Sequence, residues 1–587
     1  MESIDLEQQQ LQQSFSNVKD LEVTNIDVNF IIKHNSSAEI YQHFKDNADF
    51  LLSGKVLPAN RQQIIAQILF HANDLYGAFE DERNYLMGEI LYSWAARQQK
   101  VSIGTLWTQQ KHYCLLDTIH EQFDYFGELL EQTLSGLQYL KERCNNSEFE
   151  IFYTKFQQLA HYFLYYSVIV SRQPPSVVIK CGDAEKHRRS RFWFNTELRY
   201  DLERIDYAKI IRLRILGGHA FDLDINNNGV EIRCFLITDD TARHLLTDAY
   251  YNIYENEEFS IEPPCAVFSK KDGNLKAKFD DMRVAKKDHL RRDSVATKRY
   301  CLCYNIQLEA SHGIKLIGKK VSLPFAILVG PKSDVEARLF LERSFSDLVR
   351  RPLSDMPQKV YCQEMAEALE MKFQAIVETP QKPTDEPIMV QPRMFTLQDK
   401  EHIILRLKPN KDGQIMLENF LKLAVCQEYI KNKTTNEGEW KLVAFFDWFF
   451  KIAEIINKYL YQMWTDGLIY GFCGKDEAEE LLKNVRQHSC LLIRFSDVEY
   501  GKIKISVRYR NNVLQHHWYD YSDLNVRSLS KELLTNHKFS EIDHIYPDIN
   551  LEAALGERKK SSKNKKPRIL NPTPFYFDNQ CAATSSF

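Results

Sequence analysis

The pattern of apolar residues is helical over the first third of the chain. One stripe repeats every eleven residues and consists of Ile64, Ile68, Leu75, Phe79, Leu86 and Ile90. An eleven-residue period is typical of a long, nearly straight helix. A second stripe, at three- and four-residue spacing, consists of Leu116, Ile119, Phe123, Phe126 and Leu130. Together with a third helical pattern over 147–171, these stripes predict an elongated antiparallel helical bundle over 36–171, after a weakly structured segment over 1–35.

Two consecutive prolines, Pro174 and Pro175, mark a change of pattern. Between residues 172 and 330 the apolar runs are short, and turn signals such as Gly217-Gly218 separate them. Short strands with such turns predict a β-sandwich or barrel. Helical patterns return between 331 and 464, where we expect helices over 360–377, 397–407, 415–431 and 439–464.

An arginine at the end of an apolar run is the most informative residue of the chain. Arg494 follows Cys490-Leu491-Leu492-Ile493, which is typical of a strand that is buried on both faces. A buried guanidinium needs an anion, and its planar fork best suits a phosphate or a carboxylate. That anion is either an internal acid, Asp497 or Glu499, or a ligand. From Arg494 alone the two interpretations weigh equally.

The elements around Arg494 favour a ligand. A helix is expected to start at Lys475, because acidic residues occupy its first turn. After the strand that carries Arg494, we expect strands over 501–509 and 513–521 and a second helix over 528–534. This order is similar to the plan of the Src-homology-2 (SH2) domain, in which an arginine captures phosphotyrosine.

Three segments of this region closely resemble the STAT proteins (signal transducers and activators of transcription): WTDGLIYGF at 464–472, LLIRFS at 491–496 and YPDI at 546–549. The resemblance continues upstream in QPPSVVIK at 173–180 and SLP at 322–324, and it extends from about residue 60 to Tyr576. It implies a multidomain α+β chain, whose parts are a coiled-coil helical bundle (36–171), an immunoglobulin-like DNA-binding β-sandwich (172–330), a helical linker domain (331–464), an SH2 domain (465–556) and a flexible phosphotyrosine tail (557–587). Aromatic residues are expected to pack the linker against the SH2 domain: Trp440, Phe445, Phe446, Trp448, Phe449 and Phe450.

The resemblance also implies which residues bind phosphotyrosine. Arg494 matches the strand arginine that grips the phosphate, and Lys475 matches the first-helix lysine that adds a second positive charge. Ser496 and Asp497 match the serine and the acid of the loop that follows the arginine. The next serine of the family is Val498 here, so one hydroxyl donor is missing and we expect a weaker site.

Tyr576 lies where the family carries its phosphorylated tyrosine. A tyrosine kinase would add about −1.5 to −2 charge and three strong acceptors at this position. The tail of one copy is then expected to enter the Arg494 pocket of a second copy, and the reverse. Such an exchange makes an isologous homodimer, in which the second contact is intramolecular once the first has formed. Other phosphotyrosine-bearing proteins are possible partners of the same pocket.

Any DNA contact has to come from local clusters of lysine and arginine, because the formal net charge of the chain is −4. Two clusters lie in the predicted sandwich, over 180–191 and 283–299, and solvated loops are their alternative interpretation. The residues expected to contact the backbone of double-stranded DNA are Lys180, Lys186, Arg188, Arg189, Arg191, Arg291 and Arg292. Gly330 stands where the family usually carries a base-reading asparagine, so direct readout at that point is expected to be lost.

Motifs for catalysis, metal binding and membrane insertion are missing from the sequence. It contains no GxxxxGK[ST], HExxH or GxSxG motif and no CxxC pair among its twelve cysteines. Cys301 and Cys303 are expected to be buried free thiols. No N-terminal signal sequence occurs, and no apolar run approaches the ~18 residues of a membrane span. We therefore expect no enzymatic activity, no metal, no cofactor and no membrane insertion.

The sequence thus predicts a latent transcription factor that dimerises after phosphorylation of Tyr576 and shuttles between cytoplasm and nucleus. The predicted form lacks the family's N-terminal oligomerisation domain and, with eleven residues after Tyr576, its long transactivation tail. It would then need a partner for activation or act as a repressor. The alternative is an SH2 adaptor that docks phosphorylated partners without touching DNA. The lysine run over 559–568 is either a nuclear import signal or a linker extended by charge repulsion.

Overall fold

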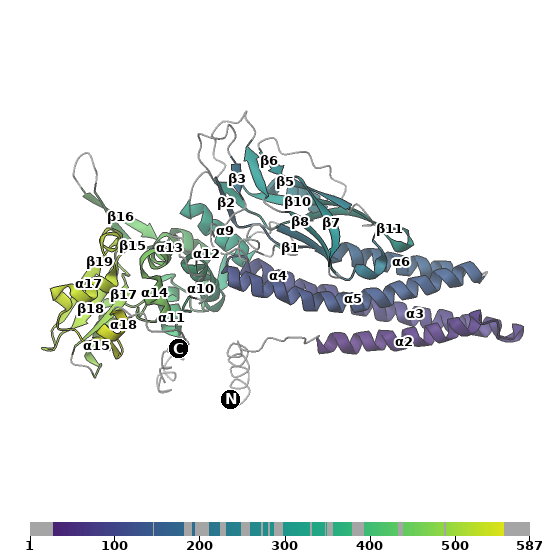
Figure 1. Ribbon diagram of the computed structural model, residues 1–587, viewed down its shortest axis with the longest axis horizontal. Helices are drawn as coiled ribbons and strands as arrows, with labels where there is room; N and C mark the ends of the chain where they lie inside the picture. The colour runs from purple at the N-terminus through teal and green to yellow at the C-terminus, as the bar shows by residue number, and fades with distance from the viewer. Residues whose placement is uncertain are drawn as a thin grey trace.

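The computed structural model describes residues 27–144, 146–180, 191–193, 211–223, 230–247, 259–271, 274–279, 282–286, 298–328, 332–346, 348, 356–378, 392–431, 438–486 and 489–556. The arrangement is elongated (Figure 1). A helical bundle lies at one end, a small sheet flanked by helices lies at the other, and a β-sandwich and a mixed helical region lie between them. None of the helices in the described ranges is both long enough and apolar enough to span a membrane.

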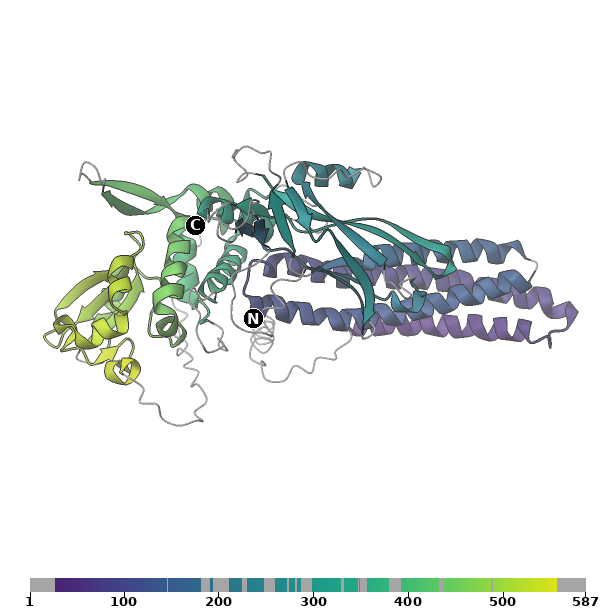
Figure 2. The ribbon, with the colours of Figure 1, turned by 45° about the horizontal axis from the view of Figure 1, so that its top comes forward.

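Long helices lie side by side in the bundle (Figure 2). They are α2 (Val28–Leu52), α3 (Arg61–Tyr85), which continues through the π-helical turn η2 (Leu86–Leu91) into α4 (Tyr92–Val101), α5 (Leu106–Arg143) and α6 (Ser147–Ser167). The predicted stripe of α3 and η2 is confirmed, since its four central residues are fully buried and its end residues, Ile64 and Ile90, are half-buried. The prediction of a weakly structured segment up to residue 35 is wrong for residues 28–35, which belong to α2. Asp27 caps this helix by accepting a hydrogen bond from Phe30 N at 3.0 Å.

Two β-sheets follow the bundle in the chain. The first sheet has the order β1-β4-β8-β7-β5-β10-β11, and the second has the order β12-β2-β3-β9-β6. Their strands are β1 (Val168–Arg172), β2 (Val177–Lys180), β3 (Arg191–Trp193), β4 (Ile211–Ile215), β5 (Val230–Thr238), β6 (Phe259–Glu262), β7 (Cys265–Lys271), β8 (Asn274–Phe279), β9 (Arg283–Lys286), β10 (Tyr300–Ala310), β11 (Ile314–Val321) and β12 (Ala326–Leu328). A helix, α8 (Asp239–Thr247), follows β5. Cys301 and Cys303 are buried free thiols, as predicted, and burial raises the pKa of Cys303 to about 12.

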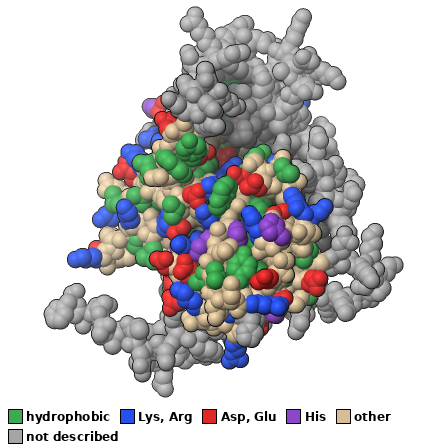
Figure 3. Space-filling view, turned by 90° about the vertical axis from the view of Figure 1, so that its left-hand side faces the viewer, with side chains coloured by type: hydrophobic (Ala, Val, Ile, Leu, Met, Phe, Trp, Pro, Cys, Tyr) green, Lys and Arg blue, Asp and Glu red, His purple; other side chains and the backbone are tan. Residues whose placement is uncertain are grey.

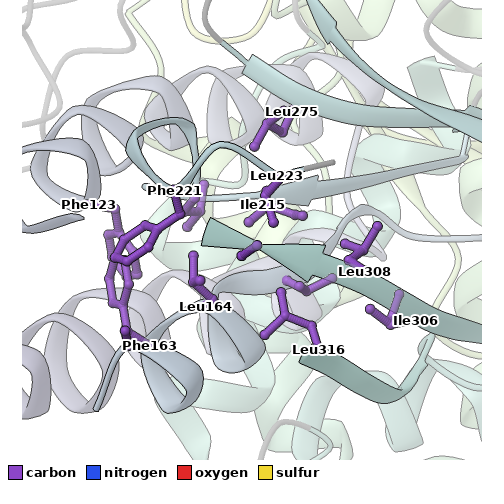
Figure 4. Close-up of a cluster of buried hydrophobic side chains, with 14 of the residues drawn as sticks. Phe123, Phe163, Leu164, Ile215, Phe221, Leu223, Leu275, Ile306, Leu308 and Leu316 are labelled. Carbon is purple, nitrogen blue, oxygen red and sulfur yellow. The ribbon is translucent and has the colours of Figure 1, made fainter. Parts of the chain in front are cut away.

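One apolar core joins the bundle to the first sheet (Figure 4). Phe123 and Phe163 come from α5 and α6, and they stack with ring centroids 5.7 Å apart. Phe221, Leu275 and strand residues face them from the sandwich side. The turn after β4 approaches α5 so closely that a Cβ on Gly217 would lie 2.3 Å from the Phe123 carbonyl oxygen. Gly217 also has a φ of +62°, which only glycine adopts without strain.

We predict that Gly217→Ala destabilises the protein by at least about 3 kcal/mol, because it adds a backbone clash to an unfavourable φ. Gly313→Ala is the matched control, since Gly313 also has a positive φ, +67°, but has open space around its Cβ position. The free energy of unfolding of the control variant should fall by only about 1–2 kcal/mol. Urea unfolding of both variants measures the difference, and equal losses would contradict this close approach.

The region after the sandwich mixes helices with short strands. Its elements are α9 (Ser333–Phe345), β13 (Lys359–Tyr361), α10 (Cys362–Glu378), α11 (Leu397–Arg406), β14 (Gln414–Met416), α12 (Leu417–Lys422), β15 (Ala424–Lys431), β16 (Gly438–Ala444), α13 (Phe445–Ile455), η6 (Ile456–Leu460) and α14 (Tyr461–Thr465). The helices predicted over 360–377 and 397–407 are present as α10 and α11.

Two predicted helices of this region are wrong in part. Residues 415–431 form only the short helix α12, and 424–431 pair with 438–444 as an antiparallel hairpin. Tyr429 and Trp440 lie opposite each other in this hairpin, with ring centroids 5.2 Å apart, and an aromatic cross-strand pair of this kind stabilises strands. Trp440 is therefore 58 % exposed in the hairpin and not buried between the linker and the SH2 domain. Phe445, Trp448 and Phe449 are buried, as predicted.

The last part of the described chain has the order of elements that the sequence predicts. Helix α15 (Lys475–Lys483) precedes β17 (Cys490–Phe495), β18 (Ile503–Arg508) and β19 (Leu514–Tyr519), and α17 (Leu529–Thr535) follows them. The sheet order is β19-β18-β17-β20-β21. Elements that the sequence did not predict are α16 (Tyr521–Val526), β20 (His544–Ile545), β21 (Ile549–Asn550) and α18 (Leu551–Leu555).

Candidate functional site

Arg494 lies in the middle strand of the last sheet. All six residues of β17 are buried, and Arg494 itself is 3 % exposed. Its Nη1 donates to the carbonyl oxygen of Cys473 at 3.1 Å and to that of Phe495 at 3.4 Å, and its Nε donates to Ser506 Oγ at 3.4 Å. Its Nη2 makes no hydrogen bond to a described residue.

No acid fully neutralises Arg494 in the described part of the chain. Asp497 Oδ1 lies 3.8 Å from Arg494 Nη1, which is too long for a hydrogen bond. Arg406 of α11 shares that carboxylate, since its Nη1 lies 3.6 Å from Asp497 Oδ2, and it also donates to the Asp497 carbonyl oxygen. Glu499, the other candidate acid, pairs with Lys502 and Lys504 instead. The internal ion pair considered in the sequence is therefore present only as a loose, shared contact with Asp497.

A polar network connects Arg494 to the first helix. Ser506 and His516 are opposite each other in the β18–β19 ladder, and His516 Nδ1 lies 3.0 Å from Ser506 Oγ. His516 Nε2 lies 3.0 Å from Glu479 Oε1 on α15, and this hydrogen bond is the main reason that the pKa of Glu479 is lowered. Neither Ser506, His516 nor Glu479 was predicted. Strand alternation and register would have placed the first two on the face that carries Arg494.

Lys475 is joined to the same network. It is the first residue of α15, its side chain is 62 % exposed, and its Nζ lies 3.6 Å from Glu479 Oε1. The structure thus brings Lys475 and Arg494 to one region through Glu479, His516 and Ser506. The two cations differ in burial, because Arg494 is enclosed and makes three hydrogen bonds, whereas most of the Lys475 side chain is exposed.

The loop after β17 carries the other predicted residues. Ser496 is 2 % exposed, its Oγ accepts a hydrogen bond from Glu499 N at 3.1 Å, and its carbonyl oxygen accepts one from Trp448 Nε1 at 2.9 Å. Ser496 therefore shapes the loop and anchors it to α13. Val498, which replaces a hydroxyl residue of the family, is 63 % exposed and contributes no donor.

Helix α11 of the preceding region forms the base of this site. Arg406 binds the Asp497 loop, and Asp399 accepts a hydrogen bond from Phe472 N at 2.9 Å. Between them, His402 lies close to both arginines, and burial together with Arg406 lowers its pKa to about 4. His402 is therefore neutral at physiological pH, and its buried Nε2 has no hydrogen-bond partner among the described residues. These residues are distant in sequence from Arg494, so no local pattern signals them.

The surface at this end of the molecule is mixed in charge. Lys and Arg side chains alternate with Asp, Glu and His side chains over the sheet and its helices (Figure 3). On the face in view, the positive charges do not form one continuous area of the kind that attracts nucleic acid.

The predicted DNA-contacting residues lie partly in the second sheet and partly outside the described residues. Lys180 ends β2 and Arg191 begins β3, and these strands pair antiparallel with Lys180 opposite Phe192. Lys186, Arg188, Arg189, Arg291, Arg292, Gly330 and Tyr576 lie outside the described residues. In the second basic cluster, Arg283 pairs with Glu262 at 2.8 Å and Arg299 pairs with Glu342 at 2.9 Å, so these two cations are already engaged.

Comparisons with known proteins agree with this geometry. The family model "Signal transducer and activator of transcription b N-terminal" matches residues 28–165, and the SH2 domain model matches residues 468–546. The chain is 60 % identical over 561 residues to "Signal transducer and activator of transcription b" of Caenorhabditis elegans, covering 95 % of this chain and 96 % of that protein. The chain belongs to the STAT family. It is thus a signal transducer and activator of transcription with an SH2 domain, and the prediction that it is not an enzyme is confirmed.

The SH2 match spans the site just described. It begins before the Cys473 carbonyl that holds Arg494 and ends at Tyr546, so it includes α15, β17, β18 and β19. SH2 domains recognise phosphotyrosine-bearing partners by arginine.

Proposed function

We propose that this STAT protein binds phosphotyrosine through Arg494. The observation that carries the proposal is a guanidinium that is 3 % exposed and is oriented by two carbonyl oxygens and a serine. Among the described residues, its Nη2 has no hydrogen-bond partner, and the Asp497 carboxylate, at 3.8 Å from Nη1, is beyond hydrogen-bond distance. A phosphate can replace the loose Asp497 contact, because it offers shorter and stronger charge-assisted hydrogen bonds. Arg406 can then retain the Asp497 carboxylate.

Lys475 and the loop residues complete the proposed pocket. Lys475 adds a positive charge from the start of α15, whose N-terminal end also favours an anion. Ser496 holds the loop in place, and Asp497 orients it between Arg494 and Arg406. In this proposal Ser506 and His516 position the guanidinium of Arg494 and do not contact the aromatic ring of the phosphotyrosine.

We further propose that the natural ligand is phosphorylated Tyr576 of a second copy. Tyr576 lies about 20 residues beyond Leu555, the last residue of α18, and an extended chain of that length spans at most about 70 Å. This reach allows the tail to pass from one protomer to the pocket of another. The reciprocal exchange gives a two-fold dimer, which we propose forms in the cytoplasm after a tyrosine kinase has acted and then enters the nucleus.

DNA binding by the dimer is the third part of the proposal. Lys180 and Arg191 lie at adjacent positions on paired strands of the second sheet, which brings the two ends of the first basic cluster close together. The engaged Arg283 and Arg299 weaken the case for the second cluster. We therefore assign the main backbone contact to Lys180, Lys186, Arg188, Arg189 and Arg191, and a smaller one to Arg291 and Arg292.

We predict that replacing Arg188, Arg189 and Arg191 by alanine makes the salt dependence of DNA binding shallower. Three lost phosphate contacts reduce the slope of log K against log salt by about 2 to 3. Electrophoretic shifts of the phosphorylated protein on a mixed-sequence duplex across a salt series measure this slope. The control variant replaces three exposed lysines elsewhere, Lys359, Lys422 and Lys531. An unchanged slope would remove this cluster from the DNA surface and favour the SH2 adaptor.

A further inference from the structure

A cavity lies between part of the bundle and the first sheet, and Arg494 is not among the residues that line it. Its volume is about 740 Å³, which lies within the range of small-molecule sites. Its walls come from α3, η2, α4 and α6 on the bundle side, and from β1 and the end of β11 on the sandwich side. The apolar part of the lining includes Met87, Leu91, Leu159, Val170, Leu323 and Pro324.

One wall of the cavity carries a lysine without an acid. Lys320 of β11 is half-buried, and its Nζ lies 4.3 Å from the ring centroid of Tyr165 and 5.5 Å from that of Tyr166. No carboxylate of the described residues pairs with it. Removal from water lowers the pKa of Lys320 to about 7. An anion that binds in the cavity would stabilise the charged form of this partly buried ammonium.

Several other polar groups of the lining already have hydrogen-bond partners. Glu80, on the bundle wall, accepts a hydrogen bond from the Tyr76 hydroxyl at 3.2 Å. Gln98 donates to the carbonyl oxygens of Val170 and Ser171, and it accepts from Gln173 Nε2 at 3.1 Å. These bonds fix the walls in position. Arg83, the other cation of the lining, donates to Asn84 Oδ1 at 2.9 Å. The ammonium of Lys320 has no hydrogen-bond partner among the described residues, so a ligand can still supply one.

The π-helical turn η2 adds a second unusual feature to the same wall. Leu86–Leu91 interrupts an otherwise continuous helix, and Met87 and Leu91 of this turn line the cavity. A π turn costs regular hydrogen bonding and is found frequently at functional sites. Here Met87 and Leu91 belong to the same cavity lining as Lys320.

We propose that this cavity binds a small anionic amphiphile, with its carboxylate or sulfonate head on Lys320 and its apolar body between η2 and β1. Such a ligand contacts the bundle and the sandwich at once. It therefore stabilises their relative position and, by linkage, the folded protein. Neither the SH2 pocket nor the basic clusters take part in this site.

The affinity for an anion depends on the charge of Lys320. The titratable or charged side chains that line the cavity or touch the lysine are Tyr76, Glu80, Arg83, Tyr92, Tyr162, Tyr165 and Tyr166. Its strand neighbours are Lys319, which precedes it on β11, and Tyr304, which lies opposite it on β10. Burial raises the pKa of Tyr76, Tyr165 and Tyr304, so these groups stay neutral near pH 7. Because the free lysine loses its proton as the pH rises through about 7, anion binding requires proton uptake above that pH and weakens about tenfold per unit.

Fluorescence titration of the full chain with 8-anilinonaphthalene-1-sulfonate tests the site. N-phenyl-1-naphthylamine is the uncharged comparison, since it has the same rings without the sulfonate. For wild type we expect one saturable sulfonate site, which Lys320→Met weakens about ten- to a hundredfold, the loss of one charge-assisted hydrogen bond. Lys320→Arg should stay within about threefold of wild type. The uncharged probe should not distinguish these proteins.

The matched control is Lys315→Met, which removes an exposed lysine from the same strand. Circular dichroism and melting temperature establish that each variant is folded, and comparison of the two probes keeps the test valid if Lys320→Met is less stable. Displacement of the sulfonate by decanoate indicates an aliphatic ligand, and displacement by 1-naphthoate an aromatic one. Equal sulfonate affinity of wild type and Lys320→Met, or displacement by neither acid, would overturn the proposal.

Discussion

Arg494→Ala is expected to reduce phosphotyrosine binding by more than about a hundredfold. The fork of Arg494 can give a phosphate two charge-assisted hydrogen bonds, each contributing about 1.5–3 kcal/mol, and about 1.4 kcal/mol corresponds to a tenfold change. No other described residue can take its place, because Arg406 is committed to Asp497 and Val425. Fluorescence anisotropy with a labelled phosphopeptide of residues 570–582 measures the loss.

Two further variants separate binding from folding. Arg494→Lys keeps a positive charge at the site but loses the planar fork, so we expect an intermediate affinity. Arg510→Ala removes an arginine from the same domain that is exposed and paired with Asp543, and it should bind like wild type. Melting temperatures identify any variant that fails to fold. Undiminished affinity of a folded Arg494→Ala protein would refute the pocket.

Tyr576→Phe is expected to leave a folded protein that stays a monomer after kinase treatment. Phenylalanine cannot carry the phosphate, so both halves of the reciprocal exchange are lost together. Because the second contact is intramolecular, the loss of dimer affinity is far larger than that of a single contact. Multi-angle light scattering should give a mass near the 69.0 kDa of one chain for the variant and about twice that for phosphorylated wild type.

The control for this result is another accessible tyrosine. Tyr429, in the β15–β16 hairpin, is 54 % exposed, and Tyr429→Phe should dimerise like wild type after the same treatment. Mass spectrometry of each sample identifies which tyrosines carry phosphate. A normal dimer peak from Tyr576→Phe would reject the tail as the ligand.

Local sequence patterns were sufficient for the elements of the SH2 domain. The buried run before Arg494 and the alternation of β18 set the strands, and the first-turn acids set α15, so the helix–strand–strand–strand–helix order could be predicted. The same patterns failed for the hairpin of β15 and β16. Its apolar residues suited a helical reading, and cross-strand packing of Tyr429 on Trp440 decided the outcome.

The surroundings of Arg494 could be predicted only in part. Asp497 was close enough in sequence to be weighed as a partner, and the structure shows why it is a weak one: Arg406 holds the same carboxylate. Arg406 and His402 come from a helix about 90 residues earlier in the chain. Their contribution depends on how α11 packs against the SH2 domain, and no periodicity or motif in a single sequence encodes such a distant contact.

Lys320 illustrates the same limit. In the sequence it belongs to a short run with Lys319 before an apolar strand end, which is typical of a solvated surface. Among the described residues, no carboxylate pairs with Lys320. Its contact with two tyrosine rings follows from the packing of β11 on α6. A cavity between two domains leaves no signature in either segment alone.

The proposed contact of the Tyr576 phosphate with a buried guanidinium is tested most directly by ³¹P NMR of the phosphorylated protein across a pH series. In wild type, Arg494 should stabilise the dianion and lower the second pKa of the phosphate below its usual value of about 6. In phosphorylated Arg494→Ala the value should return to about 6, in step with the loss of the dimer. A phosphate that titrates near 6 in both proteins would contradict the account.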